Sequence, residues 1–217
     1  ENMPDYAVMH KNFFILCCFL SLLDSWQVGI IDLYNFVMEV MHMESDVKIS
    51  VAHNEIEFAE IAALADEIWH EHYKGLLSDE QIDYMVEKFQ SQKAITKSVL
   101  ENNYTSYIMR DAGQIIGYCG VQPQPEDNSL FLSKLYLHKN YRGKHLSRMV
   151  MAMLCERCVT EDLDSIWLTV NRGNTDSIQV YRRLGFSVER EQKENIGNGY
   201  FMDDYVMRYL LPSPTIQ

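Results

Sequence analysis

Residues 130–158 constrain the fold more than any other part of the chain, because a strand pattern there runs directly into a helix pattern. Alternating leucines give way to a polar turn, and apolar residues then recur with the period of an amphipathic helix. Backbone N–H groups at the start of such a helix have no intrahelical acceptor and carry partial positive charge. Arg142 and Lys144 in the turn add full charges. The stretch alone is equally consistent with an anion-binding site and with an ordinary strand-to-helix connection.

Composition narrows the class of protein. The formal net charge is −12, which argues against a nucleic-acid-binding protein, since such proteins present clustered Lys and Arg. Five cysteines are odd in number and lack the spacing of a disulfide framework, which favours a reducing compartment such as the cytoplasm. Cys155 and Cys158 form a CxxC inside a predicted helix without a second ligand pair, so we expect packing residues and no metal site.

The first 42 residues differ from the rest of the chain. An apolar run over residues 13–23 is shorter than the roughly 20 residues that span a bilayer. Lys11 is the only positive charge before it, and no small-residue cleavage pattern follows, unlike a secretory signal. We expect residues 1–42 to form an atypical apolar helical extension that need not be native, and residues 43–217 to form the functional domain, with no membrane association.

From residue 47 onward, strand and helix patterns alternate. Asn54 with Glu57 and Ser78 with Gln81 are capping boxes that open two helices, and Gly185 stands where a left-handed helix cap belongs. Strands are predicted at residues 47–52, 104–109, 114–121, 130–137, 166–170, 186–189 and 200–210, and further helices at 91–101, 146–158 and 175–184. This order predicts an α/β fold with a mixed sheet of about seven strands and helices on both faces.

Two of these turns carry a family resemblance. YLHKNYRGKHLSRMV is similar to an acetyl-CoA pyrophosphate loop, and TVNRGNTDSIQVYRRLGF to a second signature of strand, Asn, helix, Tyr and Leu-Gly-Phe. With IWHEHYKGLLSDEQIDYMVEKFQS before them and GYFMDDYVMRYL after them, residues 44–210 resemble an uncharacterised bacterial branch of the GNAT superfamily of acetyl-CoA-dependent N-acetyltransferases. The resemblance implies a mostly antiparallel sheet, splayed at the cofactor site.

The first motif departs from the family pattern at two positions. Arg142 matches the leading arginine, but His145 and Ser147 stand where glycines are usual. Glycine lets the backbone approach a phosphate closely. We expect a negative φ at both positions, as at a helix N-terminus, so that a side chain is tolerated there. The Ser147 hydroxyl could itself donate a hydrogen bond to a phosphate.

The resemblance also implies roles for individual residues. Tyr181 matches the general acid, with a packing aromatic as the alternative, and Asn174 matches a contact to the coenzyme arm, compatible with a helix cap. The residues implied in acetyl-CoA binding are Leu135, Tyr136, Leu137, Arg142, Gly143, Lys144, His145, Leu146, Ser147, Asn174, Ser177 and Tyr181.

The acceptor site is less defined by the sequence. Trp69, Tyr73, Asp203 and Asp204 are candidates for its lining. Glu71, His72 and one of the two aspartates are candidate bases, since adjacent strand residues face opposite ways. Aromatic and acidic residues suit a cationic small-molecule or peptide amine. The resemblance implies that this amine attacks the thioester of acetyl-CoA directly, in a ternary complex. The alternatives are a non-catalytic acyl-CoA-binding sensor or subunit and a transport or membrane-associated protein; a homodimer is also compatible with the sequence.

Overall fold

A seven-stranded mixed sheet organises the chain in the computed structural model, which describes residues 47–212. The strand order is β1-β2-β3-β4-β5-β7-β6, and every neighbouring pair is antiparallel except β4 and β5, which are parallel. The strands are β1 (Lys48–Val51), β2 (Thr105–Asp111), β3 (Gln114–Gln124), β4 (Ser129–Leu137), β5 (Ser165–Asn171), β6 (Ser187–Gly197) and β7 (Tyr200–Leu210). The mixed, mostly antiparallel sheet predicted from the sequence is confirmed. The predicted N-terminal extension, residues 1–42, lies outside the described residues.

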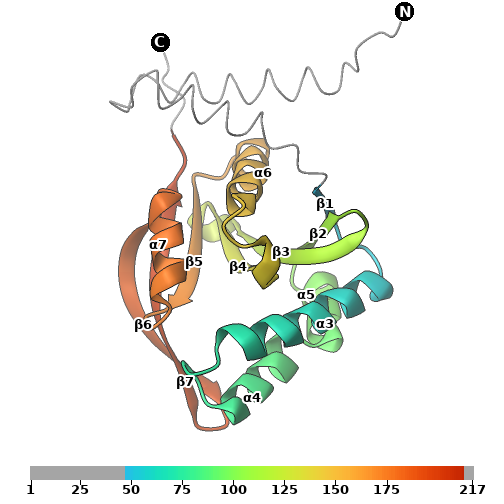
Figure 1. The fold of residues 1–217 in the computed structure, drawn as a ribbon. Helices are drawn as coiled ribbons and strands as arrows, with labels where there is room; N and C mark the ends of the chain where they lie inside the picture. The colour runs from blue at the N-terminus through green and yellow to red at the C-terminus, as the bar shows by residue number, and fades with distance from the viewer. Residues whose placement is uncertain (1–46, 213–217) are drawn as a thin grey trace, which may run out of the picture. The chain divides into compact units, whose positions relative to one another are not determined.

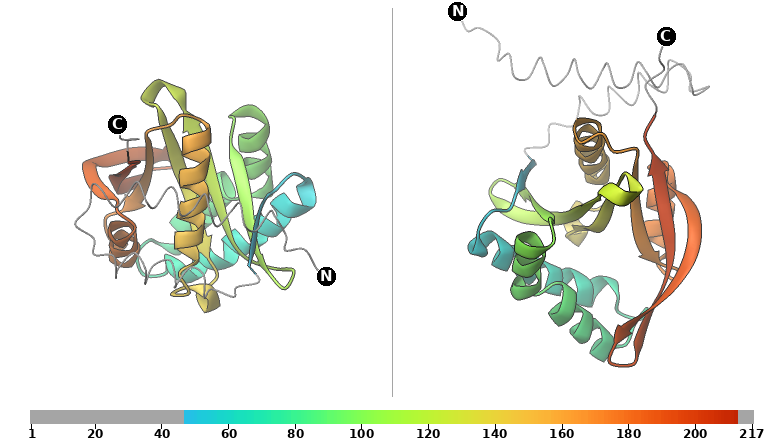
Figure 2. Two further views of the ribbon diagram at one scale, coloured as in Figure 1. Left: turned by 90° about the horizontal axis from the view of Figure 1, so that it is seen from above. Right: turned by 180° about the vertical axis from the view of Figure 1, so that it is seen from behind.

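Helices cover both faces of this sheet (Figures 1 and 2). On one face lie α3 (Glu55–His72), α4 (Asp79–Phe89) and α5 (Gln92–Glu101), and α6 (Leu146–Thr160) packs on β4 and β5 from the other. The fifth described helix, α7 (Thr175–Arg183), links β5 to β6. Short 3-10 turns at Pro125–Asp127 and Lys139–Tyr141 flank β4. Within residues 47–212, none of the helices has the length and apolar content needed to cross a membrane.

The first helices begin where their capping residues predict. The Asn54 side chain accepts a hydrogen bond from the Glu57 backbone N–H at 3.0 Å, and Ser78 does the same for Gln81 at 3.2 Å. These bonds satisfy donors that the helix itself leaves unpaired. The apolar face of α3 then buries Phe58, Ile61, Leu64, Ala65, Ile68 and Trp69 in the main core. This packing fixes the C-terminal end of α3, where His72 and Tyr73 follow, against the centre of the sheet.

The parallel pair β4–β5 separates soon after it begins. Only three residue pairs join the two strands, from Ser129 opposite Ser165 to Phe131 opposite Trp167. A β-bulge follows on β4: Leu132 and Lys134 oppose consecutive residues of β3, so that Ser133 is the extra residue. Bulges bend a strand and increase its twist. The rest of β4 therefore leaves β5, and the predicted splay of the sheet is confirmed.

The last hairpin is longer than the sequence indicated. A strand was predicted at residues 186–189, whereas β6 extends over Ser187–Gly197 and pairs with β7 along most of its length. Most β6 side chains are exposed, so the strand shows no alternation of apolar and polar residues. β6 is the edge strand of the sheet, where charged side chains are common because they discourage pairing with other chains.

The conformation of His145 differs from the prediction. A negative φ was expected, but His145 has φ 58° and ψ 12° and precedes the first residue of α6. A side chain in this left-handed region clashes with the backbone, at a cost that glycine avoids. The family usually has a glycine at this position, which adopts a positive φ easily. In this chain a histidine adopts that positive φ instead.

Substitutions at His145 test this requirement. His145→Val is expected to lower the free energy of unfolding by about 1–2 kcal/mol relative to His145→Asn, because asparagine tolerates the left-handed region and a β-branched residue does not. Both variants remove the imidazole, so their comparison isolates the backbone effect. Equal urea midpoints for the two variants would show that the turn relaxes to negative φ.

Candidate functional site

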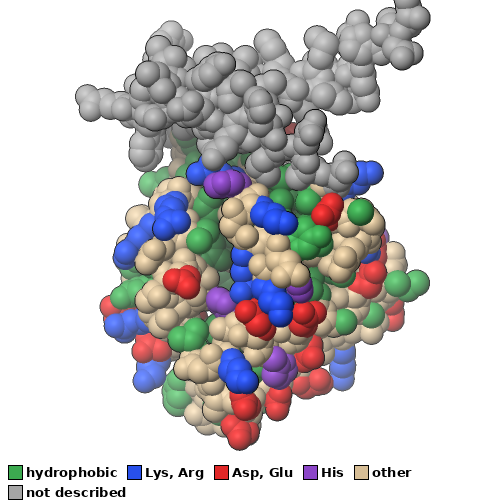
Figure 3. Space-filling model, in the orientation of Figure 1, with side chains coloured by type: hydrophobic (Ala, Val, Ile, Leu, Met, Phe, Trp, Pro, Cys, Tyr) green, Lys and Arg blue, Asp and Glu red, His purple; other side chains and the backbone are tan. Residues whose placement is uncertain are grey.

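A cavity of about 580 Å³ occupies the region where β4 leaves β5. Its walls come from α3, α4, β4, the turn before α6, β5, α7 and the β6–β7 hairpin. On the face shown in Figure 3, basic and histidine side chains lie around a central hollow. The predicted residues that line the cavity are Trp69, His72, Tyr73, Leu135, Tyr136, Leu137, Arg142, Gly143, Ser147, Asn174, Ser177 and Tyr181. Lys144, His145, Leu146, Asp203 and Asp204 are not in its lining.

The backbone of β4 provides one wall of this cavity. Leu135, Tyr136 and Leu137 pair with β3 on one side, opposite Cys119, Tyr118 and Gly117. On the other side β5 has already separated from β4. The backbone groups that point into the gap therefore have no strand partner, and such groups require a hydrogen-bonding ligand or water. An extended amide-containing molecule could bind here as an added strand.

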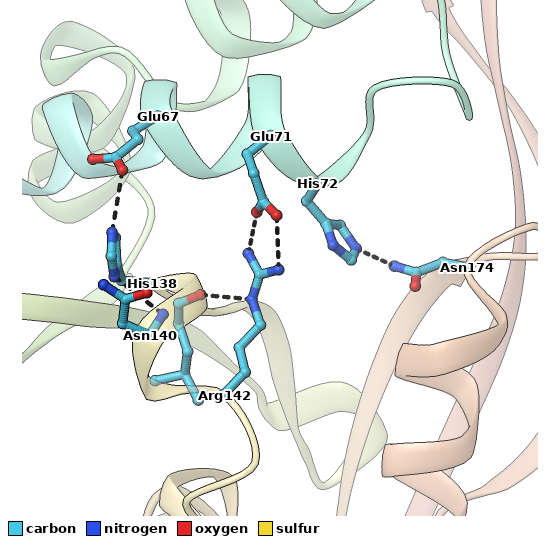
Figure 4. Close-up of polar contacts among 8 residues, drawn as sticks. Glu67, Glu71, His72, His138, Asn140, Arg142 and Asn174 are labelled. Atoms are coloured by element: carbon cyan, nitrogen blue, oxygen red, sulfur yellow. Dashed lines mark hydrogen bonds and ion pairs between the residues drawn. The ribbon is translucent and has the colours of Figure 1, made fainter.

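Arg142 connects the turn before α6 to α3 (Figure 4). Its Nε donates to the Leu137 carbonyl at 3.1 Å, and its two terminal nitrogens donate to the Glu71 carboxylate at 2.6 and 3.3 Å. This hydrogen bonding and charge hold the pKa of Glu71 below its ordinary value. Because Glu71 is ionised and paired with Arg142, it is a poor candidate for a base. A phosphate that binds Arg142 must compete with the Glu71 carboxylate.

Asn174 and His72 form a second bridge across the cavity (Figure 4). The Asn174 side-chain oxygen accepts from the Ser177 backbone N–H at 3.3 Å and so caps α7. Its amide nitrogen lies 3.0 Å from Nε2 of His72, and must donate there because the oxygen is already committed. Burial is the largest cause that lowers the pKa of His72, which favours the neutral ring that this bond requires. His72 therefore fixes the orientation of Asn174.

The position of Tyr181 follows from the way α7 ends. Gly185 has φ 95°, as predicted, and the Phe186 N–H donates to the Tyr181 carbonyl at 3.0 Å. This left-handed cap turns the chain so that the buried Phe186 ring packs edge-on to Tyr181, with centroids 5.7 Å apart. Burial raises the pKa of the Tyr181 phenol, which keeps its proton in place at neutral pH. The spacing of Tyr, Gly and Phe thus aims a protonated phenol into the cavity.

Aromatic residues fill the wall opposite α7. Trp69 and Tyr73 pack at 4.6 Å between centroids, and the Tyr136 ring stacks on Tyr118 at 5.2 Å. The Tyr73 and Tyr136 hydroxyls are 3.4 Å apart. Burial raises the pKa of both phenols, so this wall is uncharged. It suits the apolar part of a ligand, with the hydroxyls as polar anchors.

The two adjacent aspartates have different environments. Asp203 is exposed and lies 3.3 Å from Arg172, whereas Asp204 is buried and its Oδ1 has no hydrogen-bond partner. Burial, together with the charges of Asp203 and Glu194, raises the pKa of Asp204 to about 6. A carboxyl that titrates near neutrality has the pKa of a base, but Asp204 lies behind the cavity lining.

Comparison with known proteins identifies the family. The acetyltransferase (GNAT) family model matches residues 61–186, a segment that runs from α3 to the end of the second motif. This chain belongs to the GNAT family. The match includes the turn before α6 and the Asn174–Phe186 segment, which are the two motifs on which the sequence resemblance rested.

Individual relatives agree with this assignment. An uncharacterized N-acetyltransferase of Mycobacterium tuberculosis is 29% identical over 98 residues, which is 45% of this chain and 62% of the relative. The chain thus matches less than two thirds of the length of these curated relatives. Among solved structures, the PaiA N-acetyltransferase of Thermoplasma acidophilum, in complex with coenzyme A, has a TM-score of 0.63 at 18% identity and covers 76% of this chain and 99% of its own. A GCN5-related N-acetyltransferase of Rhodopseudomonas palustris has a TM-score of 0.65 at 14% identity, with 78% and 99% coverage. These structures share the fold.

Sequence reasoning missed the contacts that cross the cavity. The Arg142–Glu71 and Asn174–His72 bonds each join residues far apart in the chain, and neither spacing carried a signal. It also passed over Lys134 as a functional group. A lysine in a mostly apolar strand was the available signal, because lysine is rarely buried without a reason.

The environment of Asp204 predicts a pH dependence of stability. Its folded pKa lies above the unfolded value, so the contribution of this carboxyl to stability is fully present below about pH 4 and is lost as pH rises through about 6. Asp204→Asn is expected to be more stable than the wild type at pH 8 by about 1–3 kcal/mol, with the difference vanishing near pH 4. Urea unfolding at both pH values measures this. Glu156→Gln, which removes an exposed carboxylate of α6, is the control, and a difference for Asp204→Asn that does not change with pH would contradict the assignment.

Proposed function

We propose that this chain transfers an acetyl group from acetyl-CoA to an amine, by direct attack of the amine on the thioester in a ternary complex. The single observation that carries the proposal is that Tyr181 and the β4 edge that has left β5 line the same cavity. The strand supplies unpaired backbone groups, and Tyr181 supplies a protonated phenol. Membership of the GNAT family supports the same reaction.

Each part of the cavity has a role in this proposal. The unpaired edge of β4 binds the amide groups of the pantetheine arm, and a backbone N–H there stabilises the oxyanion that forms on the thioester carbonyl. The α6 N-terminus, Gly143 and the Ser147 hydroxyl bind the pyrophosphate, and Arg142 joins them after leaving Glu71. Tyr181 protonates the departing thiolate. The substrate is a small-molecule or peptide amine whose proton leaves before attack.

The acyl-CoA-binding alternative has its own support. The loop departs from the family pattern at His145 and Ser147, so binding of the coenzyme here need not be accompanied by catalysis. Tight acetyl-CoA binding without thiol release on any amine of a broad panel would favour a sensor or subunit. We propose that the protein acts in the cytoplasm, in keeping with the free thiols of Cys119 and Cys158. Self-association stays a prediction.

Tyr181→Phe tests the catalytic role. The variant should lose about 100-fold or more of the rate of thiol release, because it lacks the proton donor, while its acetyl-CoA affinity stays unchanged. Steady-state thiol assays and calorimetric titration measure the two quantities. Tyr205→Phe removes a hydroxyl outside the cavity lining and serves as the control. Full activity of Tyr181→Phe would remove the residue from the mechanism.

The Arg142–Glu71 ion pair makes a second prediction. Glu71→Gln should bind acetyl-CoA about two- to fivefold more tightly, because an exposed pair of this kind contributes little and its loss releases Arg142. Glu67→Gln is the matched control, since Glu67 lies on the same helix and pairs with His138 at 3.2 Å. Weaker binding by Glu71→Gln than by Glu67→Gln would show that Glu71 positions Arg142 for the ligand.

A further inference from the structure

A second cavity adjoins the first at the bulge of β4. It has a volume of about 370 Å³ and lies between α4, α5, the segment that leads into β2, and strands β3 and β4. Phe89, Phe131, Ser133 and Lys134 line both cavities, so the two share a boundary. A coenzyme arm that enters at Arg142 and follows β4 inward would place its acyl end toward this boundary. The second cavity is therefore the space beyond the reacting atoms.

The charges of the second cavity have one sign. Lys88, Lys97 and Lys134 line it, and of the described residues around it none carries a carboxylate. This contrasts with the chain as a whole, whose net charge is −12. Lys97 has Glu101 at 3.9 Å, and Lys88 donates to the Ile196 carbonyl. Within residues 47–212, Lys134 forms neither an ion pair with a carboxylate nor a hydrogen bond to a backbone carbonyl.

The ammonium group of Lys134 is held in place by three features of the sheet. Its Nζ lies 3.3 Å from the Tyr104 hydroxyl and 4.9 Å from the centre of the Tyr104 ring. Gly120, opposite Lys134 on β3, makes room for this tyrosine, because a Cβ there would lie 1.9 Å from the hydroxyl. The bulge at Ser133 sets the register that brings Lys134 opposite Gly120. Tyrosine, glycine and bulge together build the site.

Lys134 lacks the partner that a desolvated cation requires. No carboxylate among residues 47–212 forms an ion pair with it, and burial alone lowers its pKa, to about 8. At neutral pH the group is still mostly protonated. A partly buried, unpaired ammonium attracts an anion more strongly than a solvated one does, because the effective dielectric constant is lower.

We propose that the second cavity binds an anionic group of the acceptor, so that the substrate is an amine that also carries a carboxylate or a phosphate. This inference rests on the proposed function, because it names the acceptor of that reaction. Lys134 binds the anion directly, with the Tyr104 hydroxyl beside it, and Lys88 and Lys97 add attraction at the outer wall. The amine of the same molecule lies in the larger cavity, toward Tyr181.

Matched substrates test the proposal. ω-Amino carboxylates of increasing chain length are compared with their primary amides, and aminoalkyl phosphates with the corresponding amino alcohols. The wild type should favour the anionic member of its best pair by roughly tenfold or more in kcat/KM, the effect of a hydrogen bond to a charged group. The same probes are titrated by calorimetry into the protein with coenzyme A bound, which gives a readout that does not need turnover.

Three variants locate the effect. Lys134→Met should abolish the preference, and Lys134→Arg should retain part of it. Lys93→Met is the control, since Lys93 is an exposed lysine of α5 outside both cavities. Coenzyme A affinity, measured for each variant, shows that the fold and the larger cavity are intact.

Several results would overturn the inference. One is equal binding and turnover of anionic and neutral probes by the wild type, and another is a preference that survives in Lys134→Met. A Lys134-dependent preference for succinyl-CoA over acetyl-CoA would place the anion on the donor instead. Turnover of neutral amines alone would leave the proposed function intact. Lys134-dependent binding of anionic amines with no thiol release would instead support the site and refute the reaction.

Discussion

The separation of β4 from β5 is the constraint on which the rest of the site depends. The two strands pair at only three positions, and the bulge at Ser133 then bends β4 away. Continued pairing would satisfy the backbone of both strands and fill the gap that now holds the cavity. The bulge thus exchanges sheet hydrogen bonds for a binding edge, and it also sets the register of Lys134. One irregularity in one strand thus lies at the wall of the larger cavity and at its boundary with the second cavity.

Two left-handed turns aim functional groups into that gap. The first, at His145, starts α6 where its N-terminal amides can meet an anion, and the second, at Gly185, ends α7 so that Phe186 supports Tyr181. Long-range polar bonds then join these turns to α3, through Glu71 on one side and His72 on the other (Figure 4). The C-terminal end of α3 therefore forms polar contacts with both motifs. The ion pair with Glu71 occupies Arg142, so a phosphate that binds this arginine must compete with a carboxylate.

Sequence reasoning succeeded where local chemistry determines the structure. The caps at Asn54 and Ser78, the left-handed Gly185 and the strand–turn–helix at Arg142 are each specified by neighbouring residues, and the family resemblance ordered them into a sheet. It failed where the structure depends on distant partners. β6 is an edge strand without alternation, so only its pairing with β7 defines its length. The positive φ of His145 and the separation of Asp204 from the cavity depend on how α6 and β7 pack, which composition does not encode.

The acceptor preference shows why net charge is a weak guide to a site. An acidic chain with aromatic and acidic candidates around the pocket suggested a cationic amine. In the structure those carboxylates lie elsewhere: Glu71 pairs with Arg142, Asp203 with Arg172, and Asp204 is buried behind the lining. Of the carboxylates, Asp176 and Glu194 line the larger cavity. Exposed charges farther away are screened over about 8–10 Å in physiological salt, so they contribute little inside it. A desolvated ammonium a few ångströms from the ligand interacts far more strongly than many distant carboxylates. The proposed anion preference therefore rests on the local environment of Lys134, and not on the net charge of the chain.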